Sequence, residues 1–407
     1  TSPGSHSMQK IEDPADEAPP RDAYGAAYAI HFLLGAGNLL PWNALITAVD
    51  YFGRLYPDRN VEKAFAVAYM GASVVVMAVL VCWRGVRREV GLRLRLNAGF
   101  AMFILSLAVA VALNWRRCGP GAEGRADMGA YGATVGAVLV CGLADGLTGG
   151  SLVGFAGKMP ARFMQAVFAG TASSGVLVSI LRIVTKSSLP RTPQGLRRGA
   201  VLYFLVTCAV LLACIFACNL LFTLDVVVRH RRRPLPDAPP KKPSAVFWSV
   251  AGRLRWAALG VFLIYTVTLS IYPGFIADDL GSDRLRDWYP VLLIAFYNAS
   301  DFAGKCLAGI RVPAAVGAAV WGCAARLLFY PLFAACVRGP RWLRGEVPVM
   351  ALTALLGLTN GYLTSAVMML APKSVAAGEA EVAAMVMALF LGLGLLTGSV
   401  LGWVWII

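Results

Sequence analysis

The chain has little charge and little histidine. Only 14% of its 407 residues are charged and 58% are hydrophobic, a balance that excludes an ordinary soluble domain. Three histidines scattered along the sequence leave no cluster that could bind a metal ion. Eight of the nine cysteines lie inside apolar runs, so the sequence indicates no extracellular disulfide framework. No metal site and no cofactor are therefore expected.

Long apolar runs are what the sequence has instead. Eleven of them reach about 20 residues, which is enough for a helix to cross the hydrocarbon core of a bilayer. They cover residues 24–49, 63–83, 93–114, 130–154, 161–185, 199–222, 254–277, 288–310, 313–335, 347–371 and 380–405. The sequence therefore predicts an all-α polytopic membrane protein with eleven transmembrane helices.

The polar segments divide the chain into four parts. Residues 1–23 are acidic and proline-rich and are predicted to form a disordered cytoplasmic N-terminus without a cleavable signal peptide. An N-terminal six-helix half at 24–222 precedes a basic, proline-rich cytoplasmic linker at 223–253, and we expect its central segment at 229–243 to contain no packed element. A C-terminal five-helix half then follows at 254–407. Transporters are often built from two such halves, with the substrate bound between them.

The net charge of +15 is spread over short loops between the spans. It is therefore interpreted as an orientation signal rather than as a surface for a nucleic acid polymer. The basic segments at 84–95 and 229–243 are predicted to be cytoplasmic, and the acidic loop at 278–287 to lie outside. This places the N-terminus in the cytoplasm and the C-terminus outside the cell. We expect the plasma membrane rather than the vacuolar membrane.

The first span contains the segment GAGNLLPWNALITAVDYF, in which polar groups interrupt an apolar helix. Pro41 removes one backbone hydrogen bond and is predicted to bend the helix. Trp42, at the bend, offers a flat face for a purine or pyrimidine, and Leu39 and Ile46 would complete an apolar wall. Asn43 is expected to fix the bend or to bond across helices. The alternative is that Trp42 packs in an ordinary helix interface.

The eighth span, with the segment FYNASDFAGK, has the densest group of polar residues. Asn298, Asp301 and Lys305 follow the spacing i, i+3, i+7 and share one helical face. Lys305 can partly neutralise Asp301, and an ionised carboxylate accepts hydrogen bonds only, which suits the two hydroxyl donors of a ribose. A structural ion pair that joins two helices is the alternative.

Other ionisable groups within spans are candidates because each costs about 2.5–3.5 kcal/mol at a helix centre. For Asp145 three interpretations stay open: a hydrogen-bonding group for substrate, an ion pair with Arg182 of the fifth span, or a proton site. Arg182 is accordingly given a structural or gating role. His31 and Asp301 are the other possible proton sites, although a lone histidine is more often a satisfied interior group.

Three segments resemble signatures of the equilibrative nucleoside transporters, and their details resemble the plant branch. These are the PWN segment with its TAVDYF tail, NASDFAGK in the eighth span and GLTGGSLVGFAGKMP in the fourth. The resemblance implies a major-facilitator-like 6+5 arrangement in which Asp301, Lys305 and Leu395 line the substrate cavity. It also implies a base-binding glutamine at a position where this chain has Gly149.

The function expected from this resemblance is transport of nucleosides such as adenosine and uridine by alternating access, either by facilitated diffusion or coupled to protons. The partners expected are the nucleoside and the lipid bilayer, and the protein is expected to be a monomer. The alternatives are an organic cation or monoamine carrier and a nucleobase or cytokinin carrier of the same fold. Thr171 stands where the monoamine branch has an acidic residue, which favours a neutral substrate. An enzyme, a channel or a receptor is disfavoured, since no catalytic cluster or filter motif is present.

Overall fold

The computed structural model describes residues 22–57, 60–82, 90–115, 128–190, 192–232, 243–272, 284–312, 316–340, 342–343 and 345–402. Within these ranges the chain is helical and contains no strand. Residues 1–21 of the predicted disordered N-terminus, the linker centre at 233–242 and the acidic loop at 273–283 lie outside the described residues.

Among the described residues, the first half contains seven α-helices and is followed by a short eighth. They are α1 (Ala26–Thr47), α2 (Val49–Leu55), α3 (Val61–Cys82), α5 (Leu92–Trp115), α6 (Met128–Lys158), α7 (Ala161–Ser188), α8 (Pro193–Leu221) and α9 (Asp225–Arg232). The second half contains α10 (Pro243–Ile271), α12 (Trp288–Ile310), α13 (Val316–Ala325), α14 (Phe329–Arg338), α15 (Glu346–Leu370) and α16 (Ala380–Leu401).

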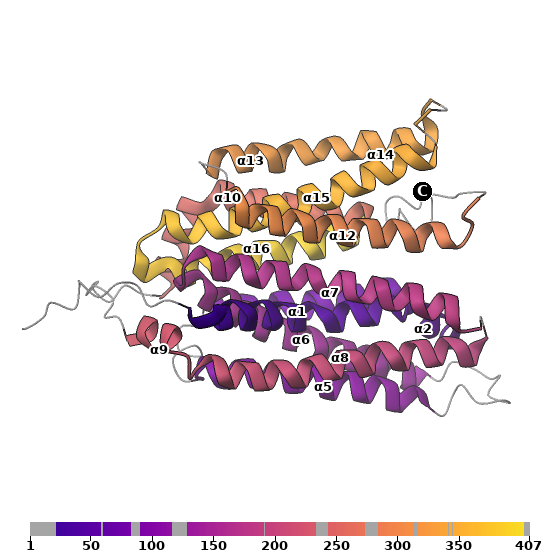
Figure 1. Cartoon of the computed structure of the whole chain (residues 1–407), viewed down its shortest axis with the longest axis horizontal. Helices are drawn as coiled ribbons and strands as arrows, with labels where there is room; N and C mark the ends of the chain where they lie inside the picture. The colour runs from indigo at the N-terminus through magenta and orange to yellow at the C-terminus, as the bar shows by residue number, and fades with distance from the viewer. Residues whose placement is uncertain are drawn as a thin grey trace, which may run out of the picture.

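Eleven membrane-spanning segments are present in the described part of the chain, six before α9 and five after it. α13 and α14 together form one of them, joined by a 3₁₀ turn at Arg326–Leu328. Figure 1 shows the long helices running along one axis, with the first half on one side of the bundle and the second half on the other. The predicted all-α 6+5 arrangement is therefore confirmed. α9 and the start of α1 lie at one end of the bundle (the α9 end), and α2 lies at the other (the α2 end).

The first span contains the proline that was predicted to bend it. α1 continues through Pro41 without interruption, and the break in the chain lies at Ala48, between α1 and α2. Neighbouring helices can make such a proline tolerable by supporting the backbone on either side. The Cys214 thiol of α8 donates a hydrogen bond to the Leu33 carbonyl of α1 at 3.3 Å. α8 thus contacts α1 about two turns before Pro41, and α1 ends at Thr47 with α2 beginning at Val49.

The two helices that carry the main polar group, α12 and α15, touch through their backbones. A Cβ atom on Gly361 would lie 2.0 Å from the Asp301 carbonyl oxygen, and one on Gly304 would lie 2.2 Å from the Leu358 carbonyl oxygen. Only glycine fits at such a close approach. Because the two backbones are so close, side chains of α15 can reach the Asp301 carboxylate.

Both ends of the predicted linker and the tail differ from expectation. α9 extends over residues 229–232 of the segment at 229–243 that was predicted to lack a packed element, and His230 Nε2 lies 2.6 Å from the Lys158 carbonyl oxygen. α10 already begins at Pro243. Asp22, within the tail predicted to be disordered, accepts hydrogen bonds from the backbone N–H groups of Ala27 and Tyr28 at 2.9 and 3.1 Å. Short charged segments here cap or extend helices rather than form free coil.

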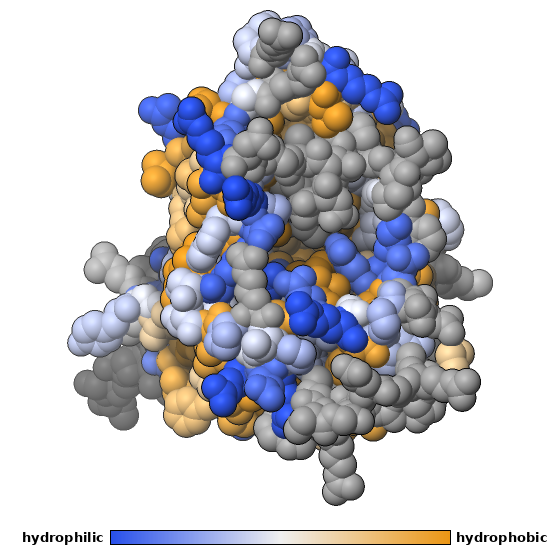
Figure 2. All heavy atoms as spheres, turned by 90° about the vertical axis from the view of Figure 1, so that its right-hand side faces the viewer, coloured by the Kyte–Doolittle hydropathy of each residue, from blue (hydrophilic) through white to orange (hydrophobic). Residues whose placement is uncertain are grey.

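The sides of the bundle expose large apolar residues, as a surface that faces lipid requires. Leu105, Phe216 and Trp321 are exposed by 62%, 73% and 78%. Figure 2 views the α2 end, where hydrophilic side chains gather across the middle and hydrophobic ones lie along the sides. The polar residues inside the bundle are therefore the exceptions that need an explanation.

Candidate substrate site

Asp301 and Lys305 form a buried ion pair one turn apart on α12. Lys305 Nζ lies 2.9 Å from Asp301 Oδ2, and the two side chains are 4% and 10% exposed respectively. The spacing in the sequence predicted this contact, because both residues lie on one face of one helix. The pair keeps a carboxylate and an ammonium group inside the bundle.

Asn360 of α15 binds the other oxygen of the same carboxylate. Its Nδ2 donates to Asp301 Oδ1 at 2.7 Å, and the residue is buried. Each carboxylate oxygen then retains a lone pair that can accept a further hydrogen bond. Sequence reasoning did not assign a role to Asn360, although it precedes Gly361, the glycine that lets α15 approach Asp301.

α12 also contacts α7, which belongs to the other half of the molecule. Asn298 Nδ2 donates to Ser179 Oγ at 2.8 Å and to the Gly175 carbonyl at 3.2 Å. Lys305 Nζ lies 3.4 Å from Thr171 Oγ1. The residues predicted on the eighth span thus lie where the two halves meet, in a polar contact that runs along α7 and α12.

Asp145 lies in the first half, on α6, and its partners are neutral. Asn38 Nδ2 donates to Asp145 Oδ1 at 3.0 Å, and Ser73 Oγ donates to Oδ2 at 2.7 Å. Thr148 Oγ1 donates to Asn38 Oδ1 at 2.5 Å, which fixes the orientation of that carboxamide. Asp145 is 8% exposed. Sequence reasoning missed Asn38 and Ser73, since only the packing of α1 and α3 on α6 brings them here.

The ion pair considered between Asp145 and Arg182 is not formed. Arg182 instead binds the Asp50 carboxylate and donates to the Thr47 carbonyl at 3.0 Å, so it holds the break between α1 and α2 against α7. The two residues lie at different positions along the axis of the bundle. Arg182 lies near the end of α7, level with α2, whereas Asp145 lies inside the bundle.

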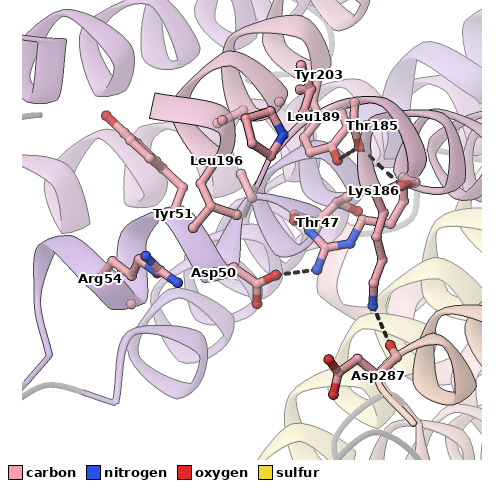
Figure 3. A pocket seen from close by; sticks show the side chains of 17 residues that line it. Thr47, Asp50, Tyr51, Arg54, Thr185, Lys186, Leu189, Leu196, Tyr203 and Asp287 are labelled. Atoms are coloured by element: carbon pink, nitrogen blue, oxygen red, sulfur yellow. Dashed lines mark hydrogen bonds and ion pairs between the residues drawn. The ribbon is translucent and has the colours of Figure 1, made fainter. Parts of the chain in front are cut away.

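Arg182 also lines a cavity of about 420 Å³ at the α2 end (Figure 3). Asp50, Arg54 and Tyr203 line it as well, and the Lys186 ammonium group crosses it to the Asp287 carbonyl oxygen. Since Lys186 belongs to α7 and Asp287 directly precedes α12, this contact joins the two halves at the α2 end.

Gly149 lies next to the Asn38 carboxamide. A Cβ atom at this position would lie 3.1 Å from Asn38 Nδ2 and 3.6 Å from Met77 Cε. A side chain at residue 149 would therefore press on Asn38. The absence of a side chain at Gly149 therefore leaves the space that the Asn38 carboxamide occupies in the first half.

Trp42 lies beside this group of residues and is 8% exposed. Its ring packs on Tyr69 at a centroid distance of 4.8 Å and an angle of 41°. The half-buried Leu39, Ile46 and Leu395 pack against the core. Asn43 donates to Ser174 Oγ of α7 at 2.8 Å, which is a bond across helices.

His31 is enclosed by aromatic rings. Its ring lies 5.8 Å from Phe155 and 4.9 Å from Phe163, and Nδ1 lies 2.7 Å from the Ala27 carbonyl oxygen. The residue has 0% exposure. Its Nε2 has no hydrogen-bond partner among the described residues. The aromatic enclosure separates the ring from water, so His31 is poorly placed to exchange protons with solvent.

The fold and this site together define a membrane transporter of the major facilitator type. The structure is similar to a bacterial homologue of the iron transporter ferroportin in an outward-facing state, with a TM-score of 0.64, 13% identity and 92% of each chain covered. It is also similar to the human organic anion transporter MFSD10, with a TM-score of 0.59, 12% identity and 95% of each chain covered. At this identity the likeness concerns the fold alone.

The sequence places the chain within a particular family. The nucleoside transporter family matches residues 135–242 and 236–407. Equilibrative nucleotide transporter 8 of Arabidopsis thaliana is 54% identical over 96% of this chain and 98% of that protein. Equilibrative nucleotide transporter 1 of the same plant is 45% identical over 95% of this chain and 88% of that protein. The chain belongs to the nucleoside transporter family.

Proposed function

We propose that the protein carries nucleosides such as adenosine and uridine across a membrane by alternating access. The observation that supports this most is the Asp301 carboxylate, which is paired with Lys305 and bonded to Asn360 where the two halves meet. It keeps unused acceptor capacity, and the two hydroxyls of a ribose are a matching pair of donors.

The charge at this site argues against a cationic substrate. Asp301 is neutralised by Lys305, and Arg326 adds a second buried positive charge nearby in the second half. Thr171, which faces Lys305, contributes a hydroxyl and no charge. A monoamine would therefore meet no unpaired carboxylate here, and a neutral nucleoside fits better.

The remaining residues would bind the base and the apolar edge of the nucleoside. Trp42 would stack on the base, a contact worth about 1–3 kcal/mol for bases on aromatic rings. Asn298 and Lys305 would contribute polar contacts from α12, and Asp145 and Gly149 would form the opposite wall. Leu39, Ile46 and Leu395 would supply the apolar surface.

Alternating access requires that contacts between the halves open at one end at a time. At the α2 end the Lys186 ammonium group bonds to the Asp287 carbonyl. At the α9 end Lys158 of α6 pairs with Glu381 of α16. We assign gating roles to these two contacts, and to Arg182 the role of holding the break after α1 closed against α7.

We further propose that Asp145 is the proton site, if transport is proton-coupled. Its hydrogen-bond partners Asn38 and Ser73 are neutral, so a bound proton would supply the compensation that Lys305 gives Asp301. His31 is the weaker candidate because of its aromatic enclosure. We place the N-terminus in the cytoplasm, the C-terminus outside and the protein in the plasma membrane as a monomer.

The test is uptake by proteoliposomes that contain the purified protein. Radiolabelled adenosine and uridine are measured with and without an imposed pH gradient, and unlabelled monoamine, nucleobase, cytokinin and uridine monophosphate are added as competitors. We expect saturable nucleoside uptake that a monoamine does not inhibit. Saturable monoamine uptake without nucleoside uptake would overturn the proposal. Stronger competition by the nucleobase or by the monophosphate than by uridine would redefine the substrate class.

A further inference from the structure

Arg326 is the largest fully buried side chain in the described part of the protein, with 2% exposure. It lies at the 3₁₀ turn that joins α13 to α14, where the ninth span changes its helical geometry. Such a turn within a span often marks a functional position. A guanidinium group at this depth needs hydrogen-bond partners. Both Nη atoms of Arg326 have them, whereas Nε has none among the described residues.

Three hydrogen bonds lead from Arg326 to the substrate site. Arg326 Nη2 donates to Thr268 Oγ1 of α10 at 2.7 Å. Thr268 Oγ1 donates to Asn360 Oδ1 at 2.8 Å. Asn360 Nδ2 donates to Asp301 Oδ1 at 2.7 Å. We call this series the α10–α15 relay.

Every donor in the relay points towards the carboxylate. Thr268 accepts from a cation and donates onward, which polarises its hydroxyl. Asn360 accepts at its oxygen and donates at its nitrogen, so only one orientation of its carboxamide satisfies both neighbours. The positive charge of Arg326 therefore fixes the side chain that holds Asp301.

Other contacts anchor Arg326 itself. Its Nη1 donates to the Leu356 carbonyl at 3.0 Å and to the Thr359 hydroxyl, both on α15. The guanidinium group is thus held against the same helix that carries Asn360. This leaves Nη2 in a fixed direction, aimed at Thr268.

We propose that Arg326 is a positioning residue, which acts through Thr268 and Asn360 to hold the Asp301 carboxylate for the ribose hydroxyls. This rests on the proposed function. Lys305 holds Oδ2 and the relay holds Oδ1, so the carboxylate has a fixed plane. Ribose recognition then depends on a residue that touches no substrate.

The sharpest test is Thr268→Val, which keeps the shape of the side chain and removes the hydroxyl from the relay. We expect the KM for uridine to rise about tenfold, because a hydrogen bond to a charged site is lost, with a much smaller change in the maximal rate. The preference for uridine over 2′-deoxyuridine should fall. Thr268→Ser restores the hydroxyl and should restore both values.

The matched control is Thr353→Val, which removes another buried hydroxyl in this half. The Thr353 hydroxyl has no hydrogen-bond partner among the described residues, so uptake should stay unchanged. Arg326→Met, made in the Thr268→Val protein, should add little to the change in KM, because the relay is already broken. A lowered thermal stability alone would not change the ribose preference.

The outcomes separate the two proposals. If the unaltered protein takes up no nucleoside, the proposed function is wrong. If it does, and Thr268→Val shows the same KM and the same ribose preference, the relay is wrong and the function stands. A drop in maximal rate that is equal for uridine and 2′-deoxyuridine would also overturn the relay, because it indicates a purely structural role.

Discussion

Each half of the molecule buries an aspartate on one of its membrane-spanning helices, Asp145 in the first half and Asp301 in the second, and the partners of the two carboxylates differ. In the second half Asp301 is bound by the ammonium group of Lys305 and by Asn360, with Arg326 behind. In the first half Asp145 is bound by the neutral groups of Asn38 and Ser73. A buried charge with a cation beside it has a fixed charge state, whereas one with neutral donors can exchange its compensation for a proton.

This difference suggests a division of labour. The Asp301 carboxylate is built to accept hydrogen bonds in every step of a transport cycle, because its partners stay with it on α12 and α15. The partners of Asp145 come from α1 and α3, whereas Asp145 itself lies on α6, so their arrangement depends on how three helices pack. Substitutions at the two aspartates and at their neighbours test whether Asp301 and Asp145 have these different roles.

The largest effect is expected from Asp301→Ala. It leaves Lys305 buried without its partner, and breaking such a pair costs about 3–5 kcal/mol. We expect uridine uptake to fall about 100-fold or more, measured in proteoliposomes with equal amounts of protein. Ser300→Ala, on the next residue, is the control for insertion and folding. If the Asp301→Ala protein reaches the membrane and transports uridine normally, the Asp301 carboxylate is not needed for transport, and the proposed difference between the two aspartates is wrong.

The next effect is expected from Trp42→Ala, on the side of the site that contains Asp145. Loss of a stacking face is worth about 1–3 kcal/mol, so the KM for uridine and for adenosine should both rise about tenfold. Trp42→Phe keeps a ring and should recover most of the affinity. A rise in KM for only one class of base would show that Trp42 does not stack but contacts a base-specific edge.

A smaller effect is expected from Gly149→Gln. The new Cβ atom would lie 3.1 Å from Asn38 Nδ2 and displace the carboxamide from Asp145 and Thr148. Overpacking of this kind costs about 1–3 kcal/mol, so we expect uptake to fall about fivefold or more. Gly132→Ala on the same helix is the control, since no atom lies within 4 Å of its Cβ position. If Gly149→Gln transports normally, the Asn38 group has no role in substrate transport.

The smallest effect on uptake without a gradient is expected from Asp145→Asn. The carboxamide keeps an acceptor for Asn38, and the Ser73 hydroxyl can turn to accept from the new amide. Uptake at equal pH should stay within about twofold, because the hydrogen bonds are retained. What should disappear is any stimulation of uptake by a pH gradient that is acid outside the vesicle. A gradient response that survives in Asp145→Asn would assign the proton to Asp301 or His31.

Sequence patterns correctly predicted the features that depend on a single helix, such as its length and the residues that share one of its faces. The eleven spans follow from apolar length, and the pair Asp301–Lys305 follows from i, i+4 spacing, so both appear in the structure as expected. The linker at 223–253 was predicted less well, since α9 and the start of α10 occupy much of it. Charge and proline content alone do not reveal that α9 docks on the end of α6.

Contacts between helices were not predictable in the same way. Asp145 and Arg182 looked like partners by charge, but α7 carries Arg182 out to Asp50 at the α2 end. Asn38 and Asn360 gave no signal of their own, because an asparagine in an apolar span does not indicate which helix it faces. Pro41 was expected to bend α1, and the structure shows α1 continuing through Pro41 as a helix to Thr47, with α2 beginning at Val49.

The sequence by itself determined the membrane class, the number of spans, the family and the face of α12 that bears Asp301, because these depend on length, composition and helical period. The tertiary structure alone decided which groups compensate each buried aspartate. That choice depends on the axial offset and rotation between packed helices, which close contacts such as Gly361 against the Asp301 backbone set. Helical period places a side chain on a face, and only packing decides what meets it there.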